Sequence, residues 1–223
     1  MRWFLQNTRK RLTFAATHPA YTFRALIREL TFADERFLAR ATEATPRAIR
    51  GFLNEPFNVP GFAHHEVLIQ YAVARAMEPD IVVETGVANS ISTTYLLLAL
   101  EKNKKGTLHS IEVGDTSFLP PGRAPGWVVP HWLHARWHLH LTAAETLLPH
   151  LLQQLGSIDL FIHDSLHTYE QMWLAFDLAY SHLRLGGLLL ADDALWNSAF
   201  LDFARRVKTP VATVIRGVGI LRA

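Results

Sequence analysis

Residues 158–194 constrain the fold more than any other stretch, because their pattern predicts a strand, a helix and a second strand in succession. A short apolar run over residues 159–163 predicts the first strand, and apolar side chains with a helical period predict a helix over residues 169–183. Gly186 and Gly187 are expected to end this helix, before a second buried strand at residues 188–191. A unit of this length makes its strands parallel neighbours through a right-handed crossover, which predicts an α/β fold.

Acidic side chains stand at the carboxyl ends of both predicted strands. Asp164 follows the first strand, with His167 three residues later, and Asp192 and Asp193 follow the second. Parallel strands lie about 4.8 Å apart, so these groups converge at the sheet edge where open α/β sheets bind ligands. Carboxylates without cysteine suit Mg²⁺, or less often Mn²⁺ or Ca²⁺. Asp164 and Asp193 are also plausible helix caps, but three acids at two adjacent strand ends favour a metal site.

The surrounding sequence supplies the other elements of such a sheet. Further strands are predicted at residues 81–84, 107–112, 137–141, 211–216 and 217–221, the last two as an antiparallel hairpin. Helices are predicted at residues 64–77, 144–155 and 196–207, and a further helix is predicted to begin with residues 93–100. A Pro/Gly-rich insertion at residues 113–136 has the length of a lid or binding loop. We therefore expect a Rossmann-like, doubly wound, mostly parallel seven-stranded sheet with an antiparallel last strand.

The turn between the first strand and its helix suggests a nucleotide ligand. It has the sequence Glu84-Thr85-Gly86-Val87-Ala88-Asn89-Ser90-Ile91-Ser92. A glycine turn lets a ligand approach the backbone, although the dinucleotide pattern G-x-G-x-x-G is absent. Glu112 ends the next strand, where a carboxylate can bind both ribose hydroxyls. Many strand–helix turns contain one glycine and many strand ends are simply solvated, but together the two features favour an adenosine-containing ligand.

Composition excludes several classes of function. The formal charge is only +2, with 22 Lys and Arg against 20 acids, which is too small an excess for a nucleic-acid-binding field. There is no cysteine, which excludes a disulfide framework and a thiol nucleophile and fits a reducing compartment. No apolar run of about 18 residues predicts a transmembrane helix. We therefore expect a cytoplasmic protein without an integral membrane segment.

Residues 1–60 differ from the predicted domain at residues 61–223. They hold ten Lys or Arg against five acids, and residues 21–30 and 33–41 have the pattern of short amphipathic helices. We interpret them as a helical cap on the domain or on a second subunit of a homo-oligomer. The alternative is a basic segment that makes peripheral contact with a membrane surface.

A histidine-rich stretch contains His131, His134, His138 and His140. A zinc site is conceivable, but neither cysteine nor H-E-x-x-H spacing supports it. Surface or loop histidines are the favoured interpretation.

These features resemble class I S-adenosylmethionine-dependent methyltransferases. The shared features are the Glu84-x-Gly86 turn, Glu112 at a strand end, and the segments LHLTAAETLLPHL, HDSLHTYE and GGLLLADD. The resemblance covers residues 64–223 and is closest to the metal-dependent O-methyltransferases of the catechol and macrolide-sugar types. The sequence departs from the family pattern at Ala88 and Ser90, where that family usually has glycine or another small residue at the first position and glycine at the second.

The resemblance implies a role for each candidate residue. The cofactor S-adenosylmethionine would be bound by Gly86 and Ser92 at its methionine part, within a turn that also includes Glu84 and Ser90, by Glu112 at its ribose, and by Ala144 and Glu145 beside adenine. Asp164, Asp192 and Asp193 would ligate Mg²⁺, and His167 would be the general base. The implied reaction is methyl transfer to a hydroxyl of a small sugar or catechol-like molecule. Two rival hypotheses are a non-catalytic binding protein on this fold and a metal-dependent hydrolase or hydroxylase-like enzyme using the same acids.

Overall fold

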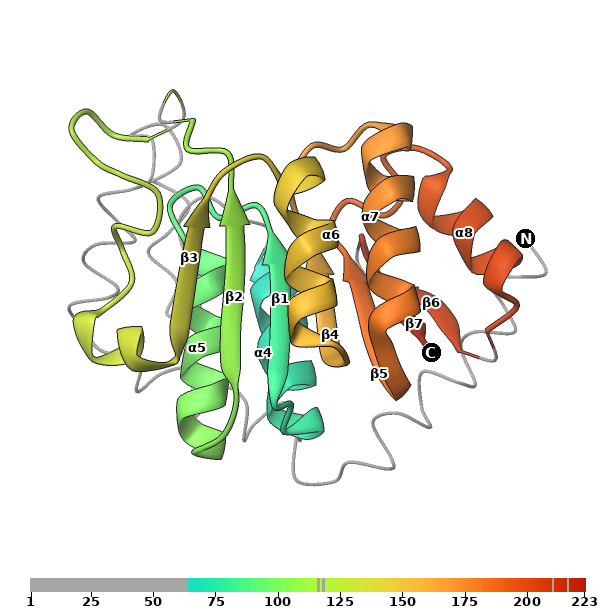
Figure 1. The fold of residues 1–223 in the computed structure, drawn as a ribbon, viewed down its shortest axis with the longest axis horizontal. Helices are drawn as coiled ribbons and strands as arrows, with labels where there is room; N and C mark the ends of the chain where they lie inside the picture. Colours follow the sequence, from blue (N-terminus) through green and yellow to red (C-terminus); the bar gives the residue numbers. More distant parts are fainter. Residues whose placement is uncertain (1–63, 116, 118, 210, 216) are drawn as a thin grey trace.

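The described part of the computed structural model comprises residues 64–223 except 116, 118, 210 and 216. These residues form one seven-stranded sheet with the order β3-β2-β1-β4-β5-β7-β6 (Figure 1). The strands are β1 (Ile81–Thr85), β2 (Thr107–Glu112), β3 (Trp137–Leu141), β4 (Ile158–His163), β5 (Leu183–Ala191), β6 (Ala212–Ile215) and β7 (Val218–Arg222). Only β7 runs antiparallel to its neighbours β5 and β6. The predicted doubly wound, mostly parallel sheet with an antiparallel last strand is confirmed.

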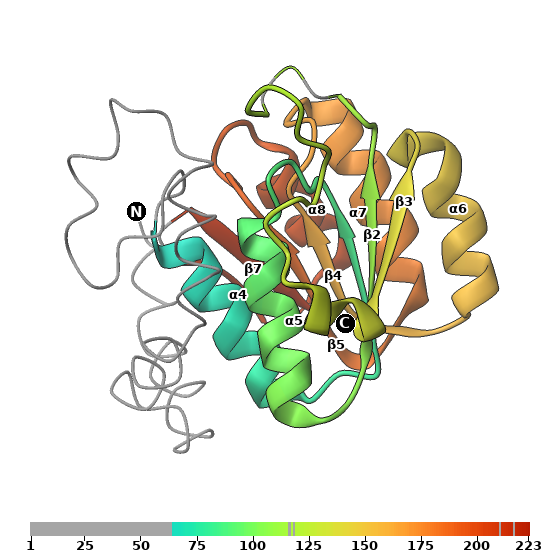
Figure 2. The same ribbon diagram turned by 90° about the vertical axis from the view of Figure 1, so that its left-hand side faces the viewer.

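Helices cover both faces of the sheet. α4 (His64–Met77) and α5 (Ile91–Asn103) lie on one face, and α6 (Ala144–Leu155), α7 (Tyr169–His182) and α8 (Ala199–Val207) lie on the other (Figures 1 and 2). The central strands alternate between two cores: Leu160 faces the α4–α5 side, and Phe161 faces the α6–α8 side. Both side chains are fully buried. Strands buried on both faces appear in sequence as nearly continuous apolar runs, which is why they are easy to predict.

The chain reverses its winding between β1 and β4, which are parallel neighbours at the centre of the sheet. Hydrogen bonds join the strand ends there: Asp164 N donates to Thr85 O at 2.8 Å, and Asp192 N donates to His163 O at 2.8 Å. The carboxyl ends of β1, β4 and β5 are therefore held side by side. This is the topological switch point, where open α/β sheets form a ligand crevice.

The predicted end of α7 is wrong. The helix ends at His182, and Gly186 and Gly187 lie inside β5, which begins at Leu183. The pairing of β4 with β5 shifts register between Ile158 and Leu160. At this irregularity a Cβ on Gly187 would lie 2.9 Å from Arg184 O and 3.0 Å from Asp159 O. The glycine is needed for close strand packing and does not cap the helix.

The start of α8 also differs from the prediction, by three residues. Residues 193–196 form a turn in which Trp196 N donates to Asp193 O at 2.7 Å. Asn197 Oδ1 then accepts a hydrogen bond from Ala199 N at 2.7 Å, the first residue of the helix. A side-chain acceptor at this position sets where a helix begins, and it places the start after Trp196.

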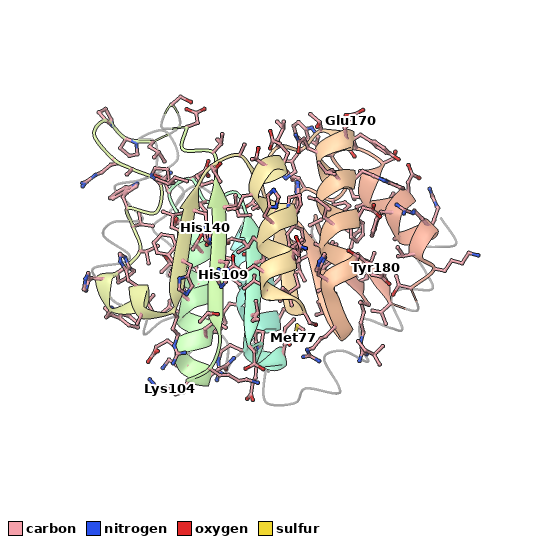
Figure 3. All side chains as sticks on the ribbon, in the orientation of Figure 1. Met77, Lys104, His109, His140, Glu170 and Tyr180 are labelled. Atoms are coloured by element: carbon pink, nitrogen blue, oxygen red, sulfur yellow. The ribbon has the colours of Figure 1, made fainter. Side chains whose placement is uncertain are left out.

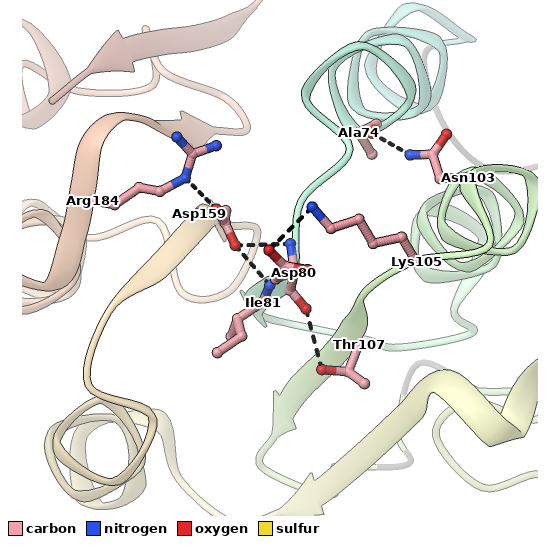
Figure 4. A network of polar contacts seen from close by, with 8 residues as sticks. All are labelled: Ala74, Asp80, Ile81, Asn103, Lys105, Thr107, Asp159 and Arg184. Atoms are coloured by element: carbon pink, nitrogen blue, oxygen red, sulfur yellow. Dashed lines mark hydrogen bonds and ion pairs between the residues drawn. The ribbon is translucent and has the colours of Figure 1, made fainter.

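At the opposite edge of the sheet, one carboxylate joins three elements (Figure 4). Asp159 Oδ2 accepts hydrogen bonds from Asp80 N at 2.9 Å and Ile81 N at 2.8 Å, and Asp159 Oδ1 pairs with Arg184. The side chain of Asp159 is 9% exposed. It therefore ties the start of β1 to β4 and β5, far from the switch-point crevice.

The remaining segments either belong to this domain or lie outside the described residues. The insertion after β2 ends in a 3₁₀ helix, η3 (His131–Arg136), and buries Val128, Val129 and Leu133 against the α4–α5 side. No helix in residues 64–223 is long and apolar enough to cross a membrane. The N-terminal helices predicted at residues 21–30 and 33–41 lie outside the described residues.

Candidate active site

A cavity of about 750 Å³ lies at the switch point, at the carboxyl edge of the sheet. It is enclosed by the turn after β1, the end of β2, the start of α6 and the loops after β4 and β5. The predicted site residues that line it are Gly86, Glu112, Ala144, Glu145, Asp164, His167 and Asp193. The topology therefore brings residues from five distant segments to one cavity.

The turn after β1 lies directly against the loop after β4. Gly86 has a φ of +91°, and a Cβ at this position would lie 1.8 Å from Asp164 O. Ala88 and Ser90 also have left-handed backbones, with φ of 43° and 70°. These are the positions at which the sequence departs from the family pattern. The left-handed conformation is retained although only the first of the three residues is a glycine.

Glu112 faces the cavity and holds this turn in place. Its Oε2 atom accepts hydrogen bonds from Val87 N and Ala88 N, both at 2.9 Å. The carboxylate thus links the end of β2 to the turn after β1. The ribose contact of Glu112 stays a prediction, and the two hydrogen bonds give this residue a structural role that the sequence did not reveal.

Three other residues predicted to bind cofactor do not line the cavity. Ser92 is buried in the first turn of α5, and Ser90 is buried at the position just before this helix. Glu84 is 1% exposed and lies outside the cavity lining, where its Oε1 accepts a hydrogen bond from Ser110 Oγ at 2.5 Å. Burial raises the pKa of Glu84 to about 7, although the hydrogen bond from Ser110 opposes the rise.

Asp164, His167 and Asp192 form a compact group on the β4–β5 side of the cavity. One ligand atom from each residue can be chosen so that all lie within 4.8 Å of one another. Asp192 Oδ1 and His167 Nε2 are buried and have no hydrogen-bond partner in the described part of the chain. Burial raises the pKa of Asp192, against a hydrogen bond from the Asp193 backbone. Two carboxylates and an imidazole this close together, with Asp192 Oδ1 and His167 Nε2 unsatisfied among the described residues, fit a divalent cation such as Mg²⁺ or Mn²⁺.

Asp193 differs from the predicted ligand set. It lines the cavity, but it is exposed and does not belong to the compact group. Its backbone is left-handed, with φ of 45°. The structure therefore groups His167, which was predicted as a base, with Asp164 and Asp192.

The geometry of this cavity agrees with a known family. A family model described as a methyltransferase domain matches residues 83–194, half of the 223-residue chain. The chain belongs to this methyltransferase family. The match runs from β1 to the turn after β5 and so includes the glycine turn, Glu112 and the acid–histidine group. With the sheet order, it identifies a class I S-adenosylmethionine-dependent methyltransferase.

Solved structures with this fold include several methyltransferases. The O-methyltransferase TomG from Streptomyces achromogenes, in complex with SAM, has a TM-score of 0.55 and 19% identity, covering 85% of this chain and 90% of that chain. Cofactor-bound Rv0187 from MTB has a TM-score of 0.54 and 19% identity, covering 85% and 89%. The MycE methyltransferase of the mycinamycin pathway, in complex with Mg, SAH and mycinamycin VI, has a TM-score of 0.50 and 13% identity, covering 79% and 53%. No curated protein sequence gave a significant match.

Two side chains of the methyltransferase that sequence reasoning passed over support His167. The buried His163 ring packs edge-on against His167, with centroids 5.6 Å apart, and burial lowers its pKa to about 3. His163 is therefore neutral at physiological pH. Asn197 Nδ2 donates to His167 O at 3.1 Å and fixes the backbone of the loop after β4. The only sign in the sequence that His163 belongs to the site was its position as a polar residue at the end of an apolar strand.

Apolar side chains at the cavity were also missed. Val113, Leu166 and Trp196 line the cavity, yet they are 63%, 61% and 73% exposed. Large apolar side chains left in water beside a cavity are typical of a ligand-binding surface. The available signal in the sequence was a tryptophan three residues after the strand-end acid Asp193.

The histidine-rich stretch does not contribute to the cavity lining. His140 of β3 lies beside His109 of β2 (Figure 3), and His138 of β3 is the register partner of His109. The rings of His109 and His138 stack at 4.6 Å, and His109 Nδ1 lies 3.4 Å from His140 Nε2. Burial, followed by repulsion from its two neighbours, lowers the pKa of His109 to about 4. Among the described residues these histidines do not form a compact ligand group like that of Asp164.

Proposed function

We propose that this methyltransferase transfers the methyl group of S-adenosylmethionine to a hydroxyl of a small, largely apolar molecule, with help from a divalent cation. The observation that carries the proposal is a single cavity with two chemically different walls. One wall contains Gly86 and Glu112, and the other contains Asp164 and His167 beside Asp192. S-adenosylmethionine, when bound, supplies an electrophilic methyl group.

The first wall suits the cofactor. Gly86 leaves the backbone open to close approach, and Glu112 offers a carboxylate for two ribose hydroxyls. Ala144 and Glu145, at the start of α6, line the same cavity at the predicted adenine position. Ser90 does not narrow the space, because its side chain is buried outside the cavity lining. TomG and Rv0187, which share the fold, are cofactor-bound.

The second wall suits the acceptor hydroxyl. We assign proton removal to His167, whose buried Nε2 has no partner in the described residues, and cation binding to Asp164 and Asp192. A divalent cation, when bound, supplies positive charge that favours the ionised hydroxyl. MycE, a relative by fold, contains Mg in its structure.

The cavity also indicates the chemical class of the acceptor. Exposed Leu166 and Trp196 lie beside the acid–histidine group and offer apolar surface to a ring or ring-like skeleton. Adjacent hydroxyls on that skeleton would present two oxygens to a cation. A catechol-like molecule combines both properties.

Isothermal titration calorimetry of the full chain tests the proposal first. We expect binding of S-adenosylmethionine and S-adenosylhomocysteine, and binding of neither would contradict methyl transfer. Release of S-adenosylhomocysteine is then followed with catechol and with resorcinol, which differ only in hydroxyl spacing. Turnover of catechol alone supports chelation by vicinal hydroxyls, and no turnover across a wider hydroxyl panel favours a non-catalytic protein.

Variants distinguish two possible roles of His167, which are proton removal and cation binding. His167→Gln should lower turnover by about 10²–10⁴-fold if the imidazole removes the proton. It should leave the Mg²⁺-dependent rise in melting temperature intact, and loss of that rise would make His167 a cation ligand instead. His150→Gln is the matched control, because His150 is exposed on α6 and does not line the cavity.

A further inference from the structure

The insertion after β2 is bonded to the back of the turn that follows β1. Gly126 N donates to Ala88 O at 3.1 Å, and Trp127 Nε1 donates to Asn89 Oδ1 at 2.7 Å. Neither Asn89 nor Trp127 lines the cavity. These two contacts join segments almost forty residues apart, and the side-chain contact involves two residues outside the cavity lining.

The turn has a physical need for such support. Ala88 and Ser90 adopt left-handed backbones, which cost an alanine or a serine free energy that glycine does not lose. Within the turn, Ser90 N donates to Val87 O at 2.6 Å, and Glu112 holds Val87 N and Ala88 N from the cavity side. Strained backbones persist only where the surroundings over-determine them. The contacts from Gly126 and Trp127 supply the restraint from the other side.

The insertion is itself firmly anchored where it touches the turn. A Cβ on Gly126 would lie 2.3 Å from the ring of Trp137, so this backbone is packed directly against β3. The Trp127 ring is partly buried against the α4–α5 core and stacks under Arg123 at 4.4 Å. Val128 and Val129 follow it into that core. The support is therefore a packed part of the domain.

We propose that Asn89 and Trp127 are positioning residues: the insertion clamps the turn in its cofactor-binding conformation, in which Ala88 and Ser90 are left-handed although neither is a glycine. The inference rests on the proposed function insofar as the turn binds S-adenosylmethionine. When the clamp is removed, a smaller fraction of the molecules has the turn in the conformation that binds the cofactor. The apparent affinity for the cofactor falls in proportion to that fraction. Asn89 and Trp127 are not among the residues that line the acceptor side of the cavity.

Two substitutions remove the clamp without enlarging the cavity. Trp127→Phe keeps an aromatic ring and loses the N–H donor, and Asn89→Leu loses the acceptor. Asn89→Asp is the conservative variant that retains an oxygen for Trp127. Trp132→Phe is the matched control, because Trp132 lies in the same insertion and is 50% exposed.

Amide hydrogen exchange of the unliganded protein gives the first readout. Residues 87–90 should exchange faster by about five- to thirtyfold in Trp127→Phe and Asn89→Leu, the range set by the cost of a left-handed residue. The Kd and KM for S-adenosylmethionine should rise by a similar factor, with kcat and the acceptor KM within about twofold of wild type. Asn89→Asp and Trp132→Phe should resemble wild type in both measurements.

A glycine rescue distinguishes the clamp from general damage. Ala88→Gly combined with Ser90→Gly removes the left-handed cost at both positions, so adding Trp127→Phe to this double variant should weaken cofactor binding by less than about twofold. Unchanged exchange and Kd in the two clamp variants, an equal effect of Trp132→Phe, or failure of the rescue would overturn the inference. Failure of the wild type to bind cofactor would instead overturn the proposed function, while hydrogen exchange would still decide whether the clamp exists.

Discussion

Glu84→Gln should stabilise the protein strongly at pH 8 and only slightly at pH 5. Glu84 is 1% exposed, and burial raises its pKa from 4.5 to about 7. Near pH 4.5 and below, the carboxyl is protonated in the folded chain and its buried state costs little. Between pH 4.5 and 7 only the folded state keeps the proton, so stability falls as pH rises, and above pH 7 the loss is constant.

The magnitude follows from the two pKa values. At about 1.4 kcal/mol per unit, the Glu84 contribution falls by about 2.5 kcal/mol between pH 5 and pH 8. Glutamine has the shape of the protonated carboxyl and does not titrate, and its oxygen can still accept the hydrogen bond from Ser110 Oγ. The difference in unfolding free energy between variant and wild type should therefore grow by about 2.5 kcal/mol over this range.

Urea unfolding followed by tryptophan fluorescence at the two pH values measures this difference. Taking the difference between two proteins cancels the titration of other groups, such as the buried His163. Glu145→Gln is the control: Glu145 is exposed, and its effect should stay within about 0.5 kcal/mol at both pH values. An equal stability difference for Glu84→Gln at pH 5 and pH 8 would refute the reasoning.

Three further predictions follow from the contacts described above. Gly86→Ala should lower the unfolding free energy by at least about 3 kcal/mol, because the new Cβ would lie 1.8 Å from Asp164 O. Gly122→Ala is the control and should cost less, because a Cβ at Gly122 would have nothing within 4 Å. Urea unfolding of the two variants measures the difference. Mg²⁺ at 100 times its Kd should stabilise the wild type by about 2.7 kcal/mol, and Asp192→Asn should abolish the corresponding rise in melting temperature. Asp159→Ala should destabilise by about 3 kcal/mol, because it leaves two backbone N–H groups and Arg184 without their acceptor, yet calorimetry should find unchanged affinity for S-adenosylmethionine.

Local sequence was sufficient for most of the secondary structure. α4, α6, β2 and β3 have the predicted bounds, because their periodicity and flanking turn residues act within a few residues of each other. The prediction was wrong at Gly186 and Gly187, since their role depends on β4. A glycine that ends a helix and a glycine that allows two strands to pack closely are indistinguishable in sequence. Only the register shift between Ile158 and Leu160 separates them.

The sequence also indicated where the site would be. Parallel strands end at one edge of a sheet, so Asp164 and Asp192 had to approach each other once β4 and β5 were neighbours. The sequence did not predict which side chains would group together at that edge. His167 joins the two acids, whereas Asp193 is exposed on a left-handed turn. Neighbouring residues in a turn differ in direction by their backbone angles, which local composition does not specify.

Sequence alone determined the order of elements, the apolar strands and the acids at their ends, because each depends on residues close together in the chain. Tertiary structure decided what required distant partners. The pKa of Glu84 depends on burial by the whole sheet, and Glu112 finds its hydrogen-bond donors 24 and 25 residues away. Trp127 reaches Asn89 across 38 residues, in a turn where Ala88 and Ser90 have left-handed backbones. The sequence showed that Ala88 and Ser90 are not glycines, but only the tertiary structure could show which distant residues contact their turn.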